Sequence, residues 1–254
     1  MSALFIIGLI LSAVIGLSLG LIGGGGSILT VPILVYLLGV GPHEAVGMSL
    51  AVVGATSVIG SYLHWRRNNV DISAGLLFGI AGIIGALLGS PLTNLVSPQA
   101  LLLLFGLLML IVAVSMLWRR NGAHVDEKKH KPHLAQGFIA GLCVGVLTGF
   151  LGVGGGFLIV PALVFFGGLP MKKAIGTSLF VIFLNCAAGL VGHMSQNVFD
   201  WRLAGVVMAL AVAGTIVGTV LSHRIAAHRL QSMFAILVLG VAAFLIVKNY
   251  AVVF

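Results

Sequence analysis

Long apolar runs alternate with short polar turns along almost the whole chain. A helix rises about 1.5 Å per residue, so about 20 apolar residues cross a hydrocarbon core about 30 Å thick. Two runs, 28–40 and 157–169, are shorter, and the sequence leaves open whether they cross the bilayer or re-enter it. The pattern predicts an all-α polytopic membrane protein with about ten helices. The eight runs close to crossing length are 2–22, 44–63, 72–95, 99–118, 134–151, 173–192, 201–222 and 230–252.

The composition agrees with a chain that is surrounded by lipid. Of its 254 residues, 60% are hydrophobic and only 7% are charged, whereas a soluble domain has about 25% charged residues. The formal net charge of +8 arises because the basic residues lie in short loops and only five residues are acidic. Membrane topology accounts for such loops, so nucleic-acid binding is not expected. We expect a multi-pass protein of the cytoplasmic (inner) membrane.

The second half of the chain repeats the first. A shift of 129 positions pairs Gly16 with Gly145 and Pro32 with Pro161 without a gap. The polar segment 119–133 divides the copies. The sequence therefore predicts a first transmembrane repeat over 1–118, a cytoplasmic linker over 119–133 and a second repeat over 134–254. The same shift pairs Gly23, Gly25, Gly26, His64 and Asp71 with Gly152, Gly154, Gly155, His193 and Asp200.

Equivalent loops of the two repeats carry opposite basic bias. Arg66 and Arg67 lie in a loop whose copy has no Lys or Arg, while Lys172 and Lys173 lie in the copy of a loop that has none. Cytoplasmic loops are enriched in Lys and Arg, so the two repeats are predicted to have inverted orientations in the membrane. Five crossings per repeat then place both termini outside the cell and eleven of the thirteen basic residues inside.

Two glycine-rich runs, Gly23–Gly26 and Gly152–Gly156, interrupt the apolar pattern. Glycine weakens a helix by about 1 kcal/mol relative to alanine, so each run is typical of a broken or re-entrant helix. Irregular backbone survives at membrane depth only inside protein or beside a wet cavity. The two breaks are expected to meet near the midplane, where free N–H groups and helix dipoles bind an anion. Close helix packing is the alternative role of glycine, and it is favoured for the scattered Gly82, Gly85 and Gly89.

Few other polar residues lie at membrane depth. Hydroxyl and amide groups bind an oxyanion without bringing a charge into the bilayer, although a hydroxyl also bonds back to its own helix. Asn185 is the residue most in need of a hydrogen-bond partner, because an unpaired amide in hydrocarbon is costly. No Asp, Glu, Lys or Arg falls at mid-depth, which argues against a buried proton relay. The predicted substrate-binding residues are Gly23, Gly24, Gly25, Gly26, Ser27, Ser49, Thr56, Gly152, Gly154, Gly155, Gly156, Phe157, Thr177, Ser178 and Asn185.

The histidines and cysteines are assigned structural roles. His64 and His193 end their apolar runs, and anchoring at the membrane interface is favoured over gating. Cys143 and Cys186 have no spacing typical of a metal or redox site, so both are expected to be small core residues. We predict no catalytic residue, no metal site and no cofactor.

The motifs "GLIGGGGSILTVPIL" and "GFLGVGGGFLIVPALV", with the following "AVGMSLAVV" and "AIGTSLFVI", resemble the TauE/SafE family. The resemblance covers essentially the whole chain. These bacterial and archaeal membrane proteins export sulfite and organosulfonates, so the resemblance implies an exporter of small sulfur oxyanions. The first copy has Gly24 and Ser27 where the second has Val153 and Gly156. Which half carries more of the binding is therefore left open.

The sequence as a whole favours a secondary transporter that exports sulfite or organosulfonates such as sulfoacetate by alternating access. An anion channel, or a transporter of another small anion, is the alternative. An enzyme is not expected, because no nucleophile or acid–base pair lies at depth, and a scaffold would need longer soluble segments. The expected partners are a small anionic substrate and the lipid bilayer, while the oligomeric state and the coupling ion are left open.

Overall fold

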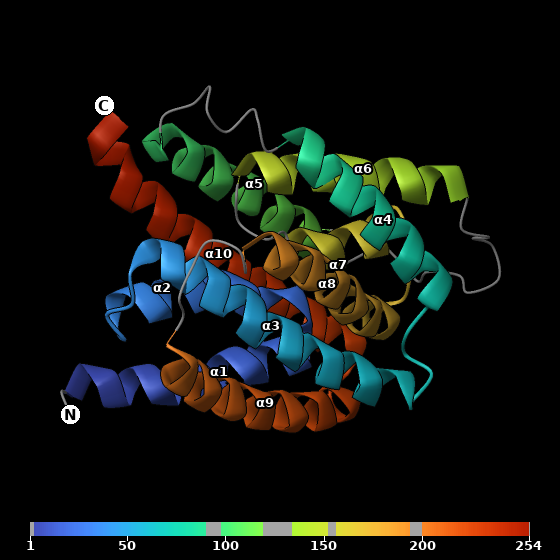
Figure 1. Cartoon of the computed structure of the whole chain (residues 1–254). Helices are drawn as coiled ribbons and strands as arrows, with labels where there is room; N and C mark the ends of the chain where they lie inside the picture. Colours follow the sequence, from blue (N-terminus) through green and yellow to red (C-terminus); the bar gives the residue numbers. More distant parts are fainter. Residues whose placement is uncertain (1–2, 90–97, 119–133, 152–155, 194–199, 254) are drawn as a thin grey trace.

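The computed structural model describes residues 3–89, 98–118, 134–151, 156–193 and 200–253 (Figure 1). Every regular element in these ranges is helical, which confirms the predicted all-α fold. The elements are α1 (Ala3–Ile22), the 3₁₀ turn η1 (Gly24–Gly26), α2 (Ser27–Tyr36), α3 (Pro42–Trp65), α4 (Ile72–Gly89), α5 (Pro98–Trp118), α6 (Leu134–Leu151), α7 (Gly156–Phe165), α8 (Met171–His193), α9 (Trp201–Arg224) and α10 (Ala227–Val253).

Among the described residues, five helices are long and apolar enough to cross a membrane. They lie in α3, α4, α8, α9 and α10 and coincide with predicted runs. α1, α5 and α6 coincide with the runs 2–22, 99–118 and 134–151, and their crossing stays a prediction. α2 and α7 have 10 residues each. A helix of that length extends about 15 Å, which is too short to cross a hydrocarbon core alone.

Two aspartates that the repeat aligns cap the starts of equivalent helices. Asp71 accepts a hydrogen bond from the Ala74 N–H at 2.9 Å before the first full turn of α4. Asp200 accepts hydrogen bonds from the Leu203 N–H at 3.2 Å and the Arg202 N–H at 2.9 Å at the start of α9. Ala74 and Leu203 are themselves repeat partners. The matched aspartates thus have one local cause, since each satisfies N–H groups that a first helical turn leaves unpaired.

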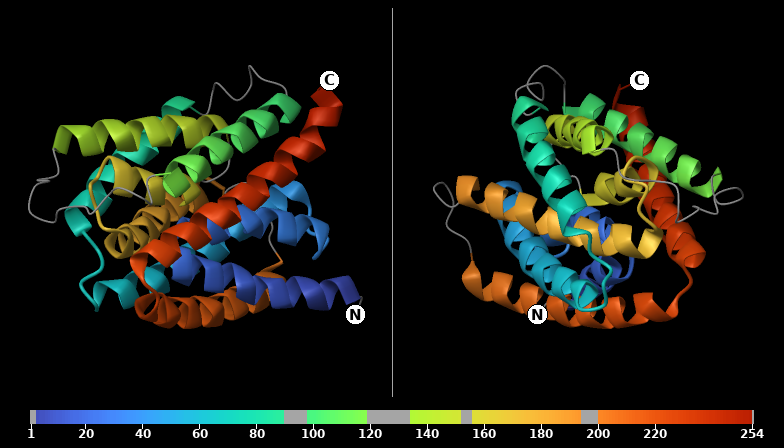
Figure 2. Two further views of the ribbon diagram at one scale, coloured as in Figure 1. Left: turned by 180° about the vertical axis from the view of Figure 1, so that it is seen from behind. Right: turned by 90° about the vertical axis from the view of Figure 1, so that its right-hand side faces the viewer.

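Helices of the two halves pack as matched pairs around a central pair. α3 lies against α8 in the middle of the bundle, with the short α2 and α7 beside them (Figure 1). α1 packs along α9 on one side, α6 packs along α4 on the other, and α5 packs along α10 (Figure 2). Exchanging the first five helices for the last five maps these pairs onto one another. A two-fold repeat is expected to pair in this way, while the inverted orientation in a membrane stays a prediction.

Glycines hold the outer helix pairs together at close range. A Cβ on Gly16 would overlap the carbonyl oxygen of Ala211 in α9, and a Cβ on Gly145 would overlap that of Gly82 in α4. These two contacts involve positions that the repeat aligns. A Cβ on Gly85 would likewise overlap the backbone of α6. These positions therefore require glycine because the neighbouring helix comes too close for a side chain. This is the role that the sequence predicted for Gly85.

The outer surface of the bundle is strongly apolar. Leu87, Trp118 and Val247 are 72%, 82% and 75% exposed. Extended apolar surface on a folded chain marks contact with a membrane or a partner, and here it follows many helices. Cys143 is exposed as well, so its predicted core position is wrong, whereas Cys186 is buried as predicted.

One end of the bundle collects most of the described cations. α3 and α9 end there, and α8 and α10 begin there (Figure 1). Lys172 of α8 donates from Nζ to the His223 carbonyl oxygen of α9 at 3.2 Å, which ties two of these helices together. Arg66, Arg67 and Arg224 lie at the same end, beside the last turns of α3 and α9. The first and last described residues lie at the opposite end (Figures 1 and 2).

Candidate substrate site at the helix breaks

Gly23 sets the first helix break. Its φ of 82° lies in the left-handed region that favours glycine. Its N–H closes α1 by donating to the Leu19 carbonyl oxygen at 2.8 Å, after which the chain turns back through η1 into α2. A Cβ on Gly23 would lie 2.6 Å from the Ser178 hydroxyl oxygen on α8. The break in the first half is therefore packed directly against the second half.

The two helix breaks meet in space. A Cβ on Gly24 would overlap the Gly156 carbonyl oxygen and would lie 2.7 Å from the Phe157 nitrogen. In return, a Cβ on Gly156 would lie 2.6 Å from the Ser27 hydroxyl oxygen and 3.4 Å from the Gly24 carbonyl oxygen. The starts of α2 and α7 thus touch backbone to backbone, so close packing is one role of glycine here. The predicted site residues Gly152, Gly154 and Gly155 lie outside the described residues.

The meeting point offers backbone donors, and the two segments that form it have no charged residue in their sequences. The first N–H groups of a helix have no acceptor within it, and the helix dipole adds about half a positive charge at that end. Residues 3–43 and 134–171 contain no Asp, Glu, Lys or Arg. The Ser27 hydroxyl donates to the Gly24 carbonyl oxygen at 2.7 Å, and the Ser178 hydroxyl donates to its own helix. Each hydroxyl would have to rotate to donate to an anion instead.

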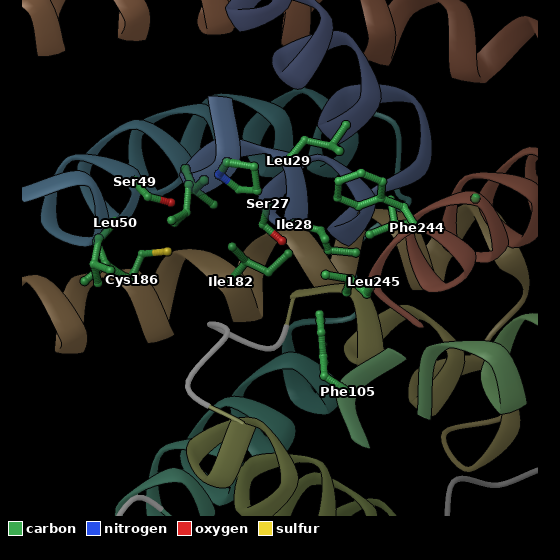
Figure 3. A pocket seen from close by; sticks show the side chains of 16 residues that line it. Ser27, Ile28, Leu29, Ser49, Leu50, Phe105, Ile182, Cys186, Phe244 and Leu245 are labelled. Atoms are coloured by element: carbon green, nitrogen blue, oxygen red, sulfur yellow. The ribbon is translucent and has the colours of Figure 1, made fainter. Parts of the chain in front are cut away.

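A cavity of about 450 Å³ lies beside the start of α2 (Figure 3). Among the described residues that line it, Ser27, Ser49 and Cys186 have polar side chains and the others are apolar. Leu50 and Cys186 lie at one end and Phe244 lies at the other (Figure 3). This is the volume of a site for a small organic ligand. Ser27 and Ser49, which the sequence predicts to bind substrate, therefore line the same cavity.

Thr56 and Thr177 are engaged away from the meeting point of α2 and α7. Thr56 donates from Oγ1 to the Val52 carbonyl oxygen of its own helix at 2.8 Å. Thr177 accepts at Oγ1 the N–H of Asp71 at 2.9 Å, which ties the start of α4 to α8. Both hydroxyls are fully buried in these contacts. Their direct contact with a substrate stays a prediction.

Asn185 lines a second, much smaller cavity of about 10 Å³ among α4, α6, α7 and α8. Its Oδ1 is buried and has no hydrogen-bond partner in the described part of the chain. Thr148 lines the same cavity and donates to the Gly145 carbonyl oxygen at 2.9 Å. A cavity of this size holds at most about one water molecule. The first half has Thr56 at the position copied by Asn185, so the two halves differ in the polar side chain that they place here.

Two buried polar residues near the first break were not predicted as functional. Ser18 is 5% exposed, and its hydroxyl has no partner among the described residues. The Ser18 hydroxyl oxygen lies 3.6 Å from the position that a Cβ on Gly25 would occupy. In the sequence, only its place shortly before the glycine run could have indicated a role. His64 is 1% exposed, so the expectation that it anchors at the interface is wrong. The side chain of His193 lies outside the described residues.

These features define a class of protein. The chain is a multi-pass helical membrane protein in which two broken helices meet beside a ligand-sized cavity. The chain belongs to the TauE/SafE family of membrane transporters, because the family profile described as "Sulfite exporter TauE/SafE" matches residues 8–245.

Curated relatives carry the same class of name. A "Probable membrane transporter protein" of Xylella fastidiosa (strain 9a5c) is 36% identical over 242 residues, which cover 93% of each chain. YunE of Bacillus subtilis is 27% identical over 269 residues, covering 96% of this chain and 98% of YunE. MJ0441 of Methanocaldococcus jannaschii is 28% identical over 243 residues, covering 89% and 90%. No solved structure matches the chain.

Proposed function

We propose that this chain is a secondary transporter, not an enzyme, that exports small sulfur-containing oxyanions across the cytoplasmic membrane by alternating access. The observation that carries this proposal is the contact between the starts of α2 and α7 beside the large cavity. Sulfite and organosulfonates present a compact group of oxygens on sulfur, and such groups accept hydrogen bonds from N–H donors at helix starts. The family profile supports the same substrate class.

In the proposed bound state, the oxyanion lies between the starts of α2 and α7. The N–H groups near Gly24 and Gly156 supply the donors, and the hydroxyls of Ser27 and Ser178 rotate to join them. Because Gly24 and Gly156 touch through their backbones, the two helix starts must move apart to admit the anion. Movement of one half against the other supplies this separation, which is what alternating access requires.

The cavity favours a sulfonate with a carbon chain over sulfite. Ser27 belongs both to the start of α2 and to the cavity lining, so an anion held there would direct its chain among Val53, Ile182 and Phe244. Burying each CH₂ group gains about 0.8 kcal/mol. A second charge, such as the carboxylate of sulfoacetate, would lose its hydration among these apolar groups. We therefore expect alkanesulfonates with one charge to bind better than sulfoacetate.

The basic end of the bundle is proposed to face the cytoplasm. Arg66, Arg67 and Lys172 at this end follow the rule that cytoplasmic loops carry the Lys and Arg excess. An anion that leaves a negative-inside cell gains about 2.3 kcal/mol per charge for each 100 mV. Export in this direction therefore needs no ATP hydrolysis.

Flux from proteoliposomes tests the proposal. The full chain is reconstituted with sulfite, methanesulfonate, butanesulfonate or sulfoacetate inside, and a potassium gradient sets the membrane potential. We expect saturable efflux that is faster with a negative interior, is stimulated by substrate on the far side, and has its highest apparent affinity for butanesulfonate. The channel alternative predicts flux without saturation or trans-stimulation. Absence of flux for every sulfur anion, in folded protein, would refute the assigned substrate class.

A further inference from the structure

His64 lies buried at the end of α3, next to the break in α1. Its Nε2 lies 3.4 Å from the Gly20 carbonyl oxygen. A carbonyl oxygen only accepts hydrogen bonds, so Nε2 carries the hydrogen of the neutral ring and Nδ1 carries a lone pair. This Nδ1 is buried, and it has no hydrogen-bond partner among the described residues.

His223 of α9 faces His64 with the opposite arrangement. The two ring centroids are 5.0 Å apart. Nδ1 of His223 lies 3.5 Å from the side-chain amide nitrogen of Asn69. An amide nitrogen only donates, so this Nδ1 accepts and the hydrogen of the neutral ring is on Nε2. That Nε2 is also buried and unpartnered in the described structure.

The two unsatisfied atoms are therefore complementary. The lone pair belongs to α3 in the first half and the N–H belongs to α9 in the second half, and the centroids of the two rings are 5.0 Å apart. We propose that His64 and His223 form a proton-binding site whose neutral form closes this end of the bundle and whose protonated form opens it. An added proton turns the accepting nitrogen of His64 into a donor, so two N–H groups then oppose each other. Imidazole is the side chain that normally changes charge between about pH 5 and pH 8.

The neighbours of the pair disfavour closure once a proton is bound. Among the described residues, the charged side chains that act on it are Arg67, from the turn after α3, and Lys172 of α8, and both are cations. The other neighbouring groups are neutral: the Gly20 carbonyl of α1, the Asn69 amide, and the backbone of α8 at Gly176, where a Cβ would lie 2.8 Å from His64 Cβ. An imidazolium here gains repulsion from cations and no ion pair with any of these groups.

Opening of this end requires α9 to release the hydrogen bond that Lys172 Nζ donates to the His223 carbonyl oxygen. At the other end of the same helices, the Asp200 N–H donates to Glu44 Oε1 at 3.0 Å and ties the start of α9 to the start of α3. Movement of α9 about that tie separates His223 from His64. His64 also contacts Gly20, close before the break at Gly23, so protonation acts on the helix break as well. This inference goes beyond the proposed function, because the proton site is defined without reference to any transported anion.

Distances between two spin labels test the proposal on the full chain in lipid nanodiscs. The labels replace Arg66 and Ala226, which are exposed at the ends of α3 and α9, in a chain with Cys143→Ala and Cys186→Ala. Lowering the pH from about 8 to about 4 is expected to shift the distance distribution to longer values. The range extends below that in which free imidazole titrates, because burial and the nearby cations oppose the bound proton. His64→Gln and His223→Gln are each expected to abolish this shift. His228→Gln, a matched control at an exposed position of α10, is expected to preserve it.

Two results would overturn the proton site. One is a distance distribution that does not change with pH in the chain with both histidines present, and the other is a pH-dependent shift that persists in His223→Gln. If His64→Gln fails to fold, His223→Gln alone decides, because the His223 ring is the less buried of the two. The measurement needs no substrate, so a failure of the proposed transport function and a failure of the proton site are distinguishable.

Discussion

Gly24 and Gly156 touch through their backbones, although they belong to different halves of the chain. A Cβ on Gly24 would overlap the carbonyl oxygen of Gly156, and no side chain separates the starts of α2 and α7 at this point. The contact that closes the core of the bundle is thus also where the backbone donors of two helices converge. Substitutions at this point therefore test packing and anion binding together.

Gly24→Ala is expected to abolish flux and to lower the melting temperature. The new methyl group meets backbone rather than a flexible side chain, and overpacking of this kind costs about 1–3 kcal/mol. Flux in proteoliposomes and thermal unfolding of the purified chain measure the two effects. Gly205→Ala on α9 is the matched control, because nothing lies within 4 Å of a Cβ there. Wild-type flux and stability in Gly24→Ala would contradict the proposed role of the contact.

Gly25→Ala separates binding from packing. A Cβ here would lie 3.3 Å from the end of the Leu237 side chain and 3.6 Å from the Ser18 hydroxyl oxygen, so the fold is expected to tolerate it. The methyl group nevertheless covers backbone that an anion must approach. We expect the concentration for half-maximal flux to rise about tenfold, corresponding to about 1.4 kcal/mol of lost binding. An unchanged value in folded protein would mean that the anion does not bind at η1.

Val53→Phe is expected to change the preference for chain length. Val53 is buried on α3 and lines the large cavity, so a phenyl ring there fills space that a carbon chain would occupy. Each CH₂ group is worth about 0.8 kcal/mol, or about fourfold in affinity, and this advantage of butanesulfonate over methanesulfonate should disappear. Competition against methanesulfonate flux measures the effect. Val58→Phe, on the exposed face of the same helix, should leave the preference intact.

Thr177→Val is expected to destabilise the chain without weakening substrate binding. The substitution removes the acceptor of the Asp71 N–H at a partly buried contact. An unsatisfied N–H costs up to about 1–3 kcal/mol where it is buried. Thr177→Ser retains the hydroxyl and should restore the melting temperature. If Thr177→Val instead kept its melting temperature and lost apparent affinity, the direct substrate contact predicted from the sequence would be the correct role.

The positions of the helices could be predicted because their signals are local. Apolar runs of crossing length coincide with helices, and the aligned Asp71 and Asp200 cap equivalent starts, since a cap depends only on the next three residues. The glycine runs likewise indicated where helices break. The candidate site was predicted in part for the same reason, because Ser27 and the glycines before it belong to one such local signal.

What the breaks and polar residues contact was decided by the tertiary structure. Thr177 and Ser178 are neighbours in sequence, yet Thr177 bonds to the start of α4 while Ser178 lies beside Gly23. In the sequence, His64 stands at the end of an apolar run, where a residue at the membrane interface is expected. In the structure, α9 packs over this position and places His223 next to the His64 ring. The sequence by itself determined the helices, their repeat and their breaks, because these depend on residues close along the chain. Only the packing of one half on the other decided which side chains share a cavity and which histidines meet, because burial depends on groups far apart in sequence.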